Sequence, residues 1–271
     1  MKQVHPWLRN LFYLGGLLSL MAGIQLFVLS EQTETYFAWT IQSPLTAATF
    51  GAFYFGTMTF GFLSGRETRW AHVRGPALGL LVFISVTLAA TLLHLDKFHL
   101  ANQNWLTMAL TWIWMLIYIL MPPMLIIMLF LQLRARGSDP ERSSNMPAWI
   151  RVLLWVHGIA GIAAALLLFF IPAMIIPVWP WALTPLTSRV FSAWLIAFGV
   201  VDLQTAWEND WHHVKIMTTG YFIFGLLAMI AMARYANEVR WSSAANIVYL
   251  AYLLAMLSIG AYGQIQTRRK Q

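Results

Sequence analysis

The chain has 271 residues, of which 59% are hydrophobic and only 10% are charged, with a mean hydropathy of +0.65. Soluble domains carry about 25% charged residues, so this composition excludes an ordinary water-soluble domain and indicates a protein that contacts a lipid bilayer. The net charge of +7 arises in short loops between apolar segments and not in a basic patch with interleaved aromatic residues, which argues against nucleic acid as a partner.

Eight apolar runs follow one another along the chain, each close to the length of about 20 residues that a transmembrane helix needs. The runs cover residues 11–29, 45–63, 76–95, 106–133, 152–171, 190–207, 216–233 and 245–262. The sequence therefore predicts an all-α integral membrane protein with eight transmembrane helices.

The two halves of the chain resemble each other at offsets of 141 and 142 residues, which one single-residue gap reconciles. The matched pairs are Trp7/Trp149, Arg9/Arg151, Gly16/Gly158, Trp39/Trp181, 44–46/185–187, Phe50/Phe191, Ala52/Ala193, Glu67/Glu208, Trp70/Trp211, His72/His213, Val73/Val214 and Arg74/Lys215. Self-similarity of this kind indicates a duplication. We expect two tandem four-helix repeats, residues 1–135 and 147–271, joined by a linker at 136–146. Because four is an even number, both repeats insert the same way up, as parallel repeats.

The basic residues predict the orientation. With the N-terminus inside, 13 of the 17 Lys and Arg residues fall on the cytoplasmic side. They are Lys2, Arg9, Arg66, Arg69, Arg74, Arg134, Arg136, Arg142, Arg151, Lys215, Arg268, Arg269 and Lys270. We therefore expect a multi-pass protein of the inner (plasma) membrane with both termini in the cytoplasm. The repeat argues that the first segment is a span and not a signal peptide, because its counterpart is internal.

A motif of the form Glu-x-x-Trp-x-His-Val-[Arg/Lys] occurs on the predicted cytoplasmic side of both halves. Its residues are Glu67, Trp70, His72 and Arg74 in the first half and Glu208, Trp211, His213 and Lys215 in the second. These residue types can bind an anionic head group. They equally suit an interfacial anchor, with Trp at head-group depth and cations facing the inner leaflet.

Two ion pairs are expected next to this motif. Arg9 and Arg151 begin the first helix of each repeat, and Glu67 and Glu208 end the second. If those helices are antiparallel neighbours, Arg9 reaches Glu67 and Arg151 reaches Glu208.

Two titratable residues lie inside predicted spans. Asp202 falls in the sixth and His157 in the fifth, at comparable depth. An intramembrane carboxylate is costly unless it is paired, so the two residues are a candidate binding or proton-relay site. A purely structural polar contact, with Arg151 as an alternative partner, also accounts for Asp202. The first half carries Gly15 and Gly61 at the matching positions.

No metal site is predicted, because His94, Asp96 and His99 suit a solvated outer loop better than a metal centre. An eight-helix membrane protein made by four-helix duplication resembles haem A synthase in outline. That family places histidine pairs within helices of both halves, whereas His72 and His213 fall in loops here. A b-type haem is kept as an alternative cofactor, and the cofactor is otherwise unknown.

A second motif opens the second and sixth predicted spans, where Trp39 and Trp181 precede Pro44-Leu45-Thr46 and Pro185-Leu186-Thr187. We expect each Pro to start a helix and each Trp to anchor the outer interface. The Trp-x-Leu-Thr-Pro-Leu-Thr string at 181–187, with the stretches at 94–99 and 118–123, resembles a group of uncharacterised bacterial multi-pass membrane proteins. That resemblance implies no activity.

Three functions follow from these patterns. The first is a non-enzymatic membrane protein that binds or moves a small apolar or amphipathic molecule between its two halves. The second is a structural subunit or assembly factor of a larger membrane complex, with other membrane subunits as partners. The third is a membrane enzyme or redox protein centred on His157 and Asp202 or on haem.

Overall fold

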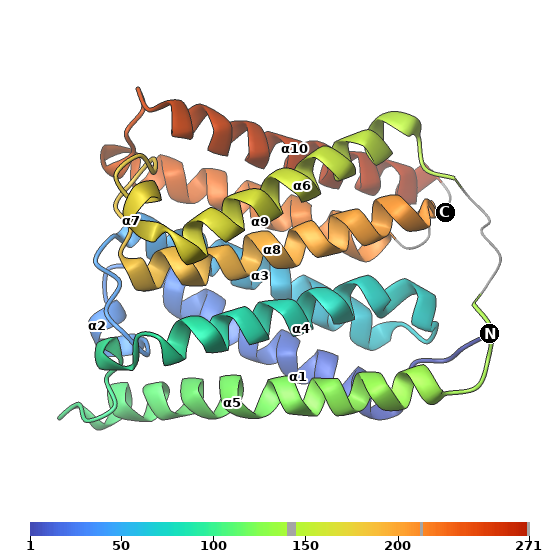
Figure 1. Ribbon diagram of the computed structural model, residues 1–271, viewed down its shortest axis with the longest axis horizontal. Helices are drawn as coiled ribbons and strands as arrows, with labels where there is room; N and C mark the ends of the chain where they lie inside the picture. Colours follow the sequence, from blue (N-terminus) through green and yellow to red (C-terminus); the bar gives the residue numbers. More distant parts are fainter. Residues whose placement is uncertain (140–144, 212–213, 270–271) are drawn as a thin grey trace.

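The computed structural model describes residues 1–139, 145–211 and 214–269. Within this range the chain is helical, apart from turns, loops and two isolated β-bridges. The helices are α1 (Pro6–Gly23), η1 (Ile24–Val28), α2 (Thr33–Tyr36), α3 (Pro44–Arg66), α4 (Trp70–Leu92), η2 (Leu95–Lys97), α5 (Trp105–Arg134), α6 (Ala148–Phe170), α7 (Pro172–Ile175), α8 (Pro185–Glu208), α9 (Lys215–Arg234), η4 (Ala236–Glu238) and α10 (Ala244–Arg269). The long helices run side by side, with the short α2 and α7 at one end of the bundle and both chain termini at the other (Figure 1). His213 and part of the predicted linker lie outside the described residues.

Seven helices in the described part of the chain are long and apolar enough to cross a membrane: α1 with η1, α4, α5, α6, α8, α9 and α10. The chain is thus a multi-pass membrane protein, and seven of the eight predicted spans coincide with such helices. The remaining predicted span forms α3, which has 23 residues, as α4 does, but is less apolar. Most residues of α3 are buried by other helices. Because few of its side chains face lipid, α3 needs fewer apolar side chains than a lipid-exposed span does.

Several long helices pack mainly against helices that are distant from them in the sequence. The most extensive contacts are α1 with α3, α6 with α8, α3 with α9, α4 with α8, and α9 with α10. The helices α3 and α4, which follow each other in the chain, touch only slightly. The two halves of the chain therefore share one bundle, in which α3 and α4 of the first half pack against α9 and α8 of the second.

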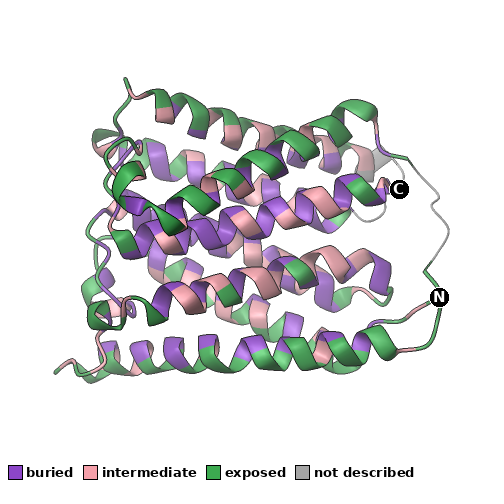
Figure 2. Cartoon of the chain, viewed as in Figure 1, coloured by how far each residue is buried: buried purple, intermediate pink, exposed green. Residues whose placement is uncertain are grey.

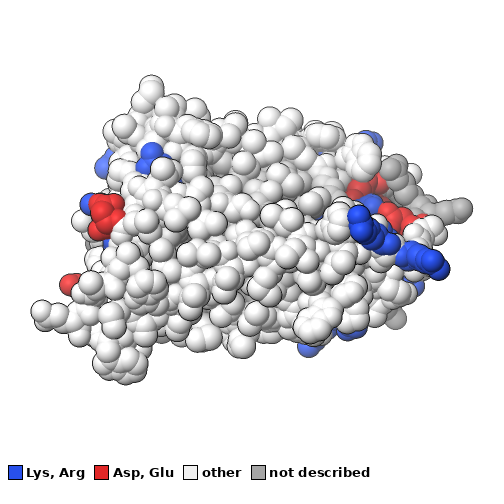
Figure 3. All heavy atoms as spheres, turned by 60° about the horizontal axis from the view of Figure 1, so that its bottom comes forward, with Lys and Arg blue, Asp and Glu red and all other residues white. Residues whose placement is uncertain are grey.

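The surface separates into charged ends and an uncharged middle. On the face drawn in Figure 3, charged side chains gather at the two ends of the molecule, with an uncharged band between them. Large apolar side chains such as Leu116, Ile159 and Val248 are exposed on α5, α6 and α10, while α8 is mostly buried (Figure 2). An apolar surface of this breadth is stable in lipid and costly in water.

Both predicted helix starts are confirmed. The helix α3 begins at Pro44 and α8 begins at Pro185, and the side chain of the preceding Ser43 or Thr184 accepts a hydrogen bond from a backbone N–H of the first turn. The prediction for the two tryptophans is wrong. Trp39 and Trp181 are only 2% and 0% exposed, because neighbouring helices and loops cover them, so they are core residues and not anchors at the lipid surface.

Aromatic side chains fill the centre of the bundle. Phe53 of α3 stacks on Trp194 of α8 and on Phe224 of α9, with ring centroids 4.9 and 4.1 Å apart and an interplanar angle of 10° in each pair. Stacked and edge-on ring pairs add about 0.5–1.5 kcal/mol each beyond the area that they bury. This cluster fixes α3, α8 and α9 around the site described next.

Candidate functional site

A buried hydrogen-bond network joins α6, α8 and α9. His157 Nδ1 of α6 lies 2.6 Å from Asp202 Oδ2 of α8, and these side chains are 1% and 0% exposed. Tyr221 of α9 donates its hydroxyl to the other carboxylate oxygen at 2.7 Å. Asp202 thus has a partner on each oxygen, which offsets the cost of burying it.

The other nitrogen of His157 has no such partner. Tyr252 of α10 stacks on the imidazole ring, with centroids 3.7 Å apart. His157 Nε2 and the Tyr252 hydroxyl are both buried, and neither has a hydrogen-bond partner among the described residues. A carboxylate on Nδ1 orients an imidazole so that Nε2 is the nitrogen left to accept a proton or a ligand. His157 Nε2 is therefore the one nitrogen of the imidazole that the network leaves unused.

A cavity of about 50 Å³ shares α8 with this network. Its walls come from α1, α3, α4 and α8, and it is partly open. One water molecule needs about 10–15 Å³ and two to four polar partners, so the space is large enough for water but poorly suited to it. Aromatic rings make up much of the wall: Phe12, Phe60, Phe83, Trp194 and Phe198.

The cavity occupies the place in the first half that corresponds to the polar network in the second. Gly15, Gly61 and Leu80 line it. At the offsets of 142 and 141 residues, the counterparts of these three residues are His157, Asp202 and Tyr221. Where one half has three polar side chains in contact, the other therefore has two glycines, a leucine and open space.

The two cavity glycines differ in their surroundings. A Cβ atom added at Gly15 would meet no heavy atom within 4 Å. One added at Gly61 would lie 2.6 Å from the Cα of Gly16, because α1 and α3 approach each other closely there. Of these two lining positions, Gly15 is therefore the one that can accept a side chain without a clash.

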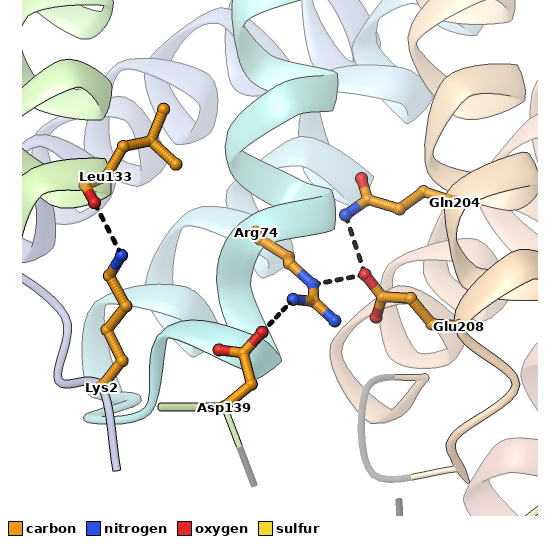
Figure 4. Close-up of polar contacts among 6 residues, drawn as sticks. All are labelled: Lys2, Arg74, Leu133, Asp139, Gln204 and Glu208. Carbon is orange, nitrogen blue, oxygen red and sulfur yellow. Dashed lines mark hydrogen bonds and ion pairs between the residues drawn. The ribbon is translucent and has the colours of Figure 1, made fainter. Parts of the chain in front are cut away.

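The repeated Glu/Trp/His/Arg motif divides between two polar clusters at the end of the bundle that holds the termini. In the first, Arg74 of α4 bonds to Glu208 of α8 and, at 2.5 Å, to Asp139 of the linker, while Gln204 also donates to Glu208 (Figure 4). Beside this cluster is an open cleft lined partly by Lys2, Trp70 and Gln204. These contacts tie α4, α8 and the linker together.

In the second cluster, His72 Nδ1 lies 3.0 Å from Glu67 Oε2. The hydrogen bond from His72 lowers the pKa of the Glu67 carboxyl. Trp70 and Trp211 are 6% and 7% exposed, which fits core packing better than anchoring in the head-group layer. Lys215 is exposed, and the structure does not bring it together with His157 and Asp202.

The predicted ion pairs are wrong in their acceptors. Arg9 Nε donates to the carbonyl of Gly65 at 3.0 Å, and Arg151 Nε donates to the carbonyl of Ala206 at 3.0 Å. Each carbonyl belongs to a residue two positions before the expected glutamate. The reason is that the last carbonyls of a helix lack intrahelical partners and lie at its negative end, where they attract a cation. The helices are neighbours as expected, but Glu67 and Glu208 pair with His72 and Arg74 instead.

The histidines of the loop after α4 have partners of their own. His94 Nε2 accepts a hydrogen bond from Arg189 Nη1 at 2.6 Å, and His99 Nε2 lies 3.1 Å from the Thr40 hydroxyl. Asp96 pairs with Lys97. Among the described residues, no group of three or more His, Asp or Glu side chains is placed to hold a metal ion.

Sequence reasoning missed several residues of the site. The sequence around Tyr221 and Tyr252 contains no motif that indicates a site, because a tyrosine within an apolar run is typical of a packed core residue. The cavity wall residues Leu80 and Trp194 were likewise missed. Extending the repeat into α4 and α9 aligns Gly79 with Gly220 and Phe83 with Phe224, and this alignment places Leu80 opposite Tyr221.

Comparisons with protein-family models, with curated proteins and with solved structures found no match to this chain.

Proposed function

We propose that this protein binds or moves a small apolar or amphipathic molecule, and that the molecule enters the cavity between α1, α3, α4 and α8. The cavity carries this proposal. Its lining includes no charged residue and has three helices from the first half of the chain and one from the second. Filling apolar space with an apolar molecule is favourable because it supplies the van der Waals contacts that the cavity lining otherwise lacks.

The proposal includes an architecture of eight spans in two parallel repeats. Equivalent contacts support it: α1 packs on α3 as α6 packs on α8, and α9 packs on α3 as α4 packs on α8. Arg9 and Arg151 make equivalent hydrogen bonds. Phe53 and Trp194 occupy equivalent positions and stack on each other, as residues on a two-fold axis do. The bias of basic residues supports an inner-membrane location with both termini in the cytoplasm.

The test is to identify what the purified protein carries. We would purify the wild-type protein in mild detergent, extract it with organic solvent and analyse the extract by mass spectrometry against empty micelles. An apolar molecule present at a fixed ratio to protein is the expected result.

Two glycine variants show whether that molecule occupies the cavity. Gly15→Leu fills the space and should lose the molecule. Gly75→Ala is the matched control: Gly75 does not line the cavity, and a Cβ there meets its nearest heavy atoms at 3.9 and 4.0 Å. If the folded Gly15→Leu variant retains the molecule, the cavity is not its site.

The same preparation distinguishes the other two functions. Stoichiometric co-purifying proteins with no small molecule indicate a structural subunit or assembly factor. A Soret band in the absorption spectrum indicates a haem protein. Either result without an apolar ligand contradicts the proposed function.

A further inference from the structure

The cleft beside Arg74 lies at the end of the bundle that holds the chain termini and has a volume of about 440 Å³. We infer that it binds one anionic phospholipid, with the phosphate group held by Lys2 and Arg74 and an acyl chain lying between α4 and α5. The cleft shares no lining residue with the cavity between α1, α3, α4 and α8. The inference therefore goes beyond the proposed function and adds a second binding site.

The lining of the cleft changes from polar to apolar along α4. Trp70, Arg74 and Leu78 line it together, because side chains four positions apart lie on the same face of a helix. Leu129 and Leu133 of α5 line the same cleft. Arg74 is nearer the end of the bundle than Leu78, since α4 begins at Trp70. This order of groups matches a phospholipid, in which a charged head group is followed by acyl chains.

The two helices that flank the apolar part of the cleft are packed less closely than their counterparts. The last long helix of the second half, α10, packs extensively on α9, whereas the last of the first half, α5, makes much less contact with α4. Leu78 and Leu133 are exposed although they line the cleft. A free phosphate ion covers no apolar surface, whereas an acyl chain packs against both leucines. The apolar part of the cleft therefore favours a lipid over a soluble anion.

The polar part of the cleft has hydrogen-bond donors for a phosphate group. Lys2 Nζ donates to the carbonyl of Leu133 at 2.9 Å, and an ammonium group has three N–H donors. Arg74 uses Nε for Glu208 and Nη1 for Asp139, and its Nη2 takes part in neither contact (Figure 4). Ammonium and guanidinium groups both donate to phosphate oxygens.

Basic residues outnumber carboxylates around the cleft, which favours a head group with net negative charge. The carboxylates at Arg74 are those of Asp139 and Glu208. Two exposed arginines are each next in sequence to a lining residue, Leu133 or Gly137. The basic residues are Lys2, Arg74, Arg134 and Arg136. Basic pockets between transmembrane helices attract anionic lipid head groups in this way.

Titration of phospholipids into the delipidated protein tests the inference. Native mass spectrometry of the full chain in detergent gives the affinities for palmitoyl-oleoyl phosphatidylglycerol and phosphatidylcholine, which share acyl chains and phosphate and differ in net charge. We expect wild type to bind one phosphatidylglycerol about tenfold more tightly, the ratio that one charge-assisted hydrogen bond gives. Equal affinity for the two lipids overturns the inference. So does displacement of the lipid by glycerophosphate, which has the phosphate without acyl chains.

Variants of two lysines show whether the preference arises in the cleft. Lys2→Gln should lower the preference for phosphatidylglycerol about fivefold, the share of one basic residue near an anionic lipid, and Lys2→Arg should retain it. Lys97→Gln is the matched control, because it removes the same charge at the opposite end of the bundle, where Lys97 is exposed and pairs with Asp96. If both glutamine variants lower the preference equally, net charge alone is responsible and the inference fails.

Variants of two leucines test the position of the acyl chain. Leu78→Trp fills the apolar part of the cleft and should weaken the binding of both lipids. Leu116→Trp makes the same change on the exposed surface of α5, outside the cleft, and should leave both affinities unchanged. Wild-type affinities in Leu78→Trp place the lipid elsewhere and overturn the inference. Gly15→Leu should not change lipid binding, so this result and that for the proposed function are independent.

Discussion

At three equivalent positions, the first half of the chain carries Gly15, Gly61 and Leu80 and the second half carries the network residues His157, Asp202 and Tyr221. In the second half the three side chains form a buried network, with contacts of 2.6 and 2.7 Å. In the first half the corresponding residues surround a cavity of about 50 Å³. Similar helix packing thus supports a polar network in one half and an apolar cavity in the other.

The comparison shows which part of a helix pair sets its chemistry. The pairs α1–α3 and α6–α8 each pack closely and are each linked by an arginine that donates to a helix-terminal carbonyl. Backbone proximity is therefore similar in the two pairs. The pairs differ in the side chains at two equivalent positions. The pair α6–α8 has His157 and Asp202 there, which form a buried network, and the pair α1–α3 has Gly15 and Gly61, which line a cavity. Variants at the polar network and at the cavity measure how far these two places differ in energy, and variants at the two ends of the bundle extend the comparison of the halves.

The largest effect is expected from breaking the polar network. His157→Leu leaves the buried Asp202 with Tyr221 as its remaining partner, and removal of one member of a buried pair costs about 3–5 kcal/mol. The double variant His157→Leu/Asp202→Asn should recover part of that loss, because it also removes the charge. Unfolding by denaturant in mild detergent measures both. The single variant Asp202→Asn completes the comparison. If the loss of unfolding free energy in the double variant equals the sum of the losses in the two single variants, the residues are not coupled.

The next largest effect is expected at the two glycines that line the cavity. Gly61→Ala places a methyl group 2.6 Å from the Gly16 backbone, which forces α1 and α3 apart and should cost about 1–3 kcal/mol. Gly15→Ala adds the same methyl group to open space and should leave the free energy of unfolding nearly unchanged. Thermal unfolding of the two variants side by side is the measurement. A destabilised Gly15→Ala would mean that the space beside Gly15 is already filled.

A smaller asymmetry occurs at the end that holds the termini. Arg74 bonds to Glu208 and Asp139, whereas its counterpart Lys215 is exposed and forms no ion pair with the described residues. Arg74→Gln should therefore lower the free energy of unfolding by about 1 kcal/mol, a value reduced by partial solvent exposure. Lys215→Gln should change it by less. Reversal of this order in denaturant unfolding would contradict the difference between the two clusters.

The smallest effect is a pH dependence of stability that arises in the loop after α4. At the offset of 141 residues, His94 of this loop corresponds to Tyr235 in the loop after α9. Burial and the neighbouring Arg189 lower the pKa of His94. The unfolded chain, with a histidine pKa of about 6.5, therefore takes up a proton before the folded chain does. Stability should be constant above that pH and fall as the pH drops below it. His94→Gln should reduce this dependence, as measured by the melting temperature between pH 8 and pH 5, and an unchanged slope would exclude His94 as a cause.

The sequence determined the elements and several of their partners without any tertiary information. Apolar runs of about 20 residues placed seven helices that are candidate spans, because a helix satisfies its backbone hydrogen bonds within its own segment. Pro44 and Pro185 marked helix starts for an equally local reason. The offset of 141–142 residues also identified positions that correspond in the structure, such as Arg9 and Arg151, which make equivalent hydrogen bonds.

The sequence proposed His157 and Asp202 as one site, and only the tertiary structure decided which other side chains join them. The pairing of α3 with α9 and of α4 with α8 depends on shape complementarity summed over whole helix faces. No single residue in the sequence predicts that pairing. That pairing brings Tyr221 to Asp202, sends Arg74 to Glu208 and leaves space beside Gly15. Because a cavity is defined by atoms that are absent, it appears only when the surrounding helices are in place.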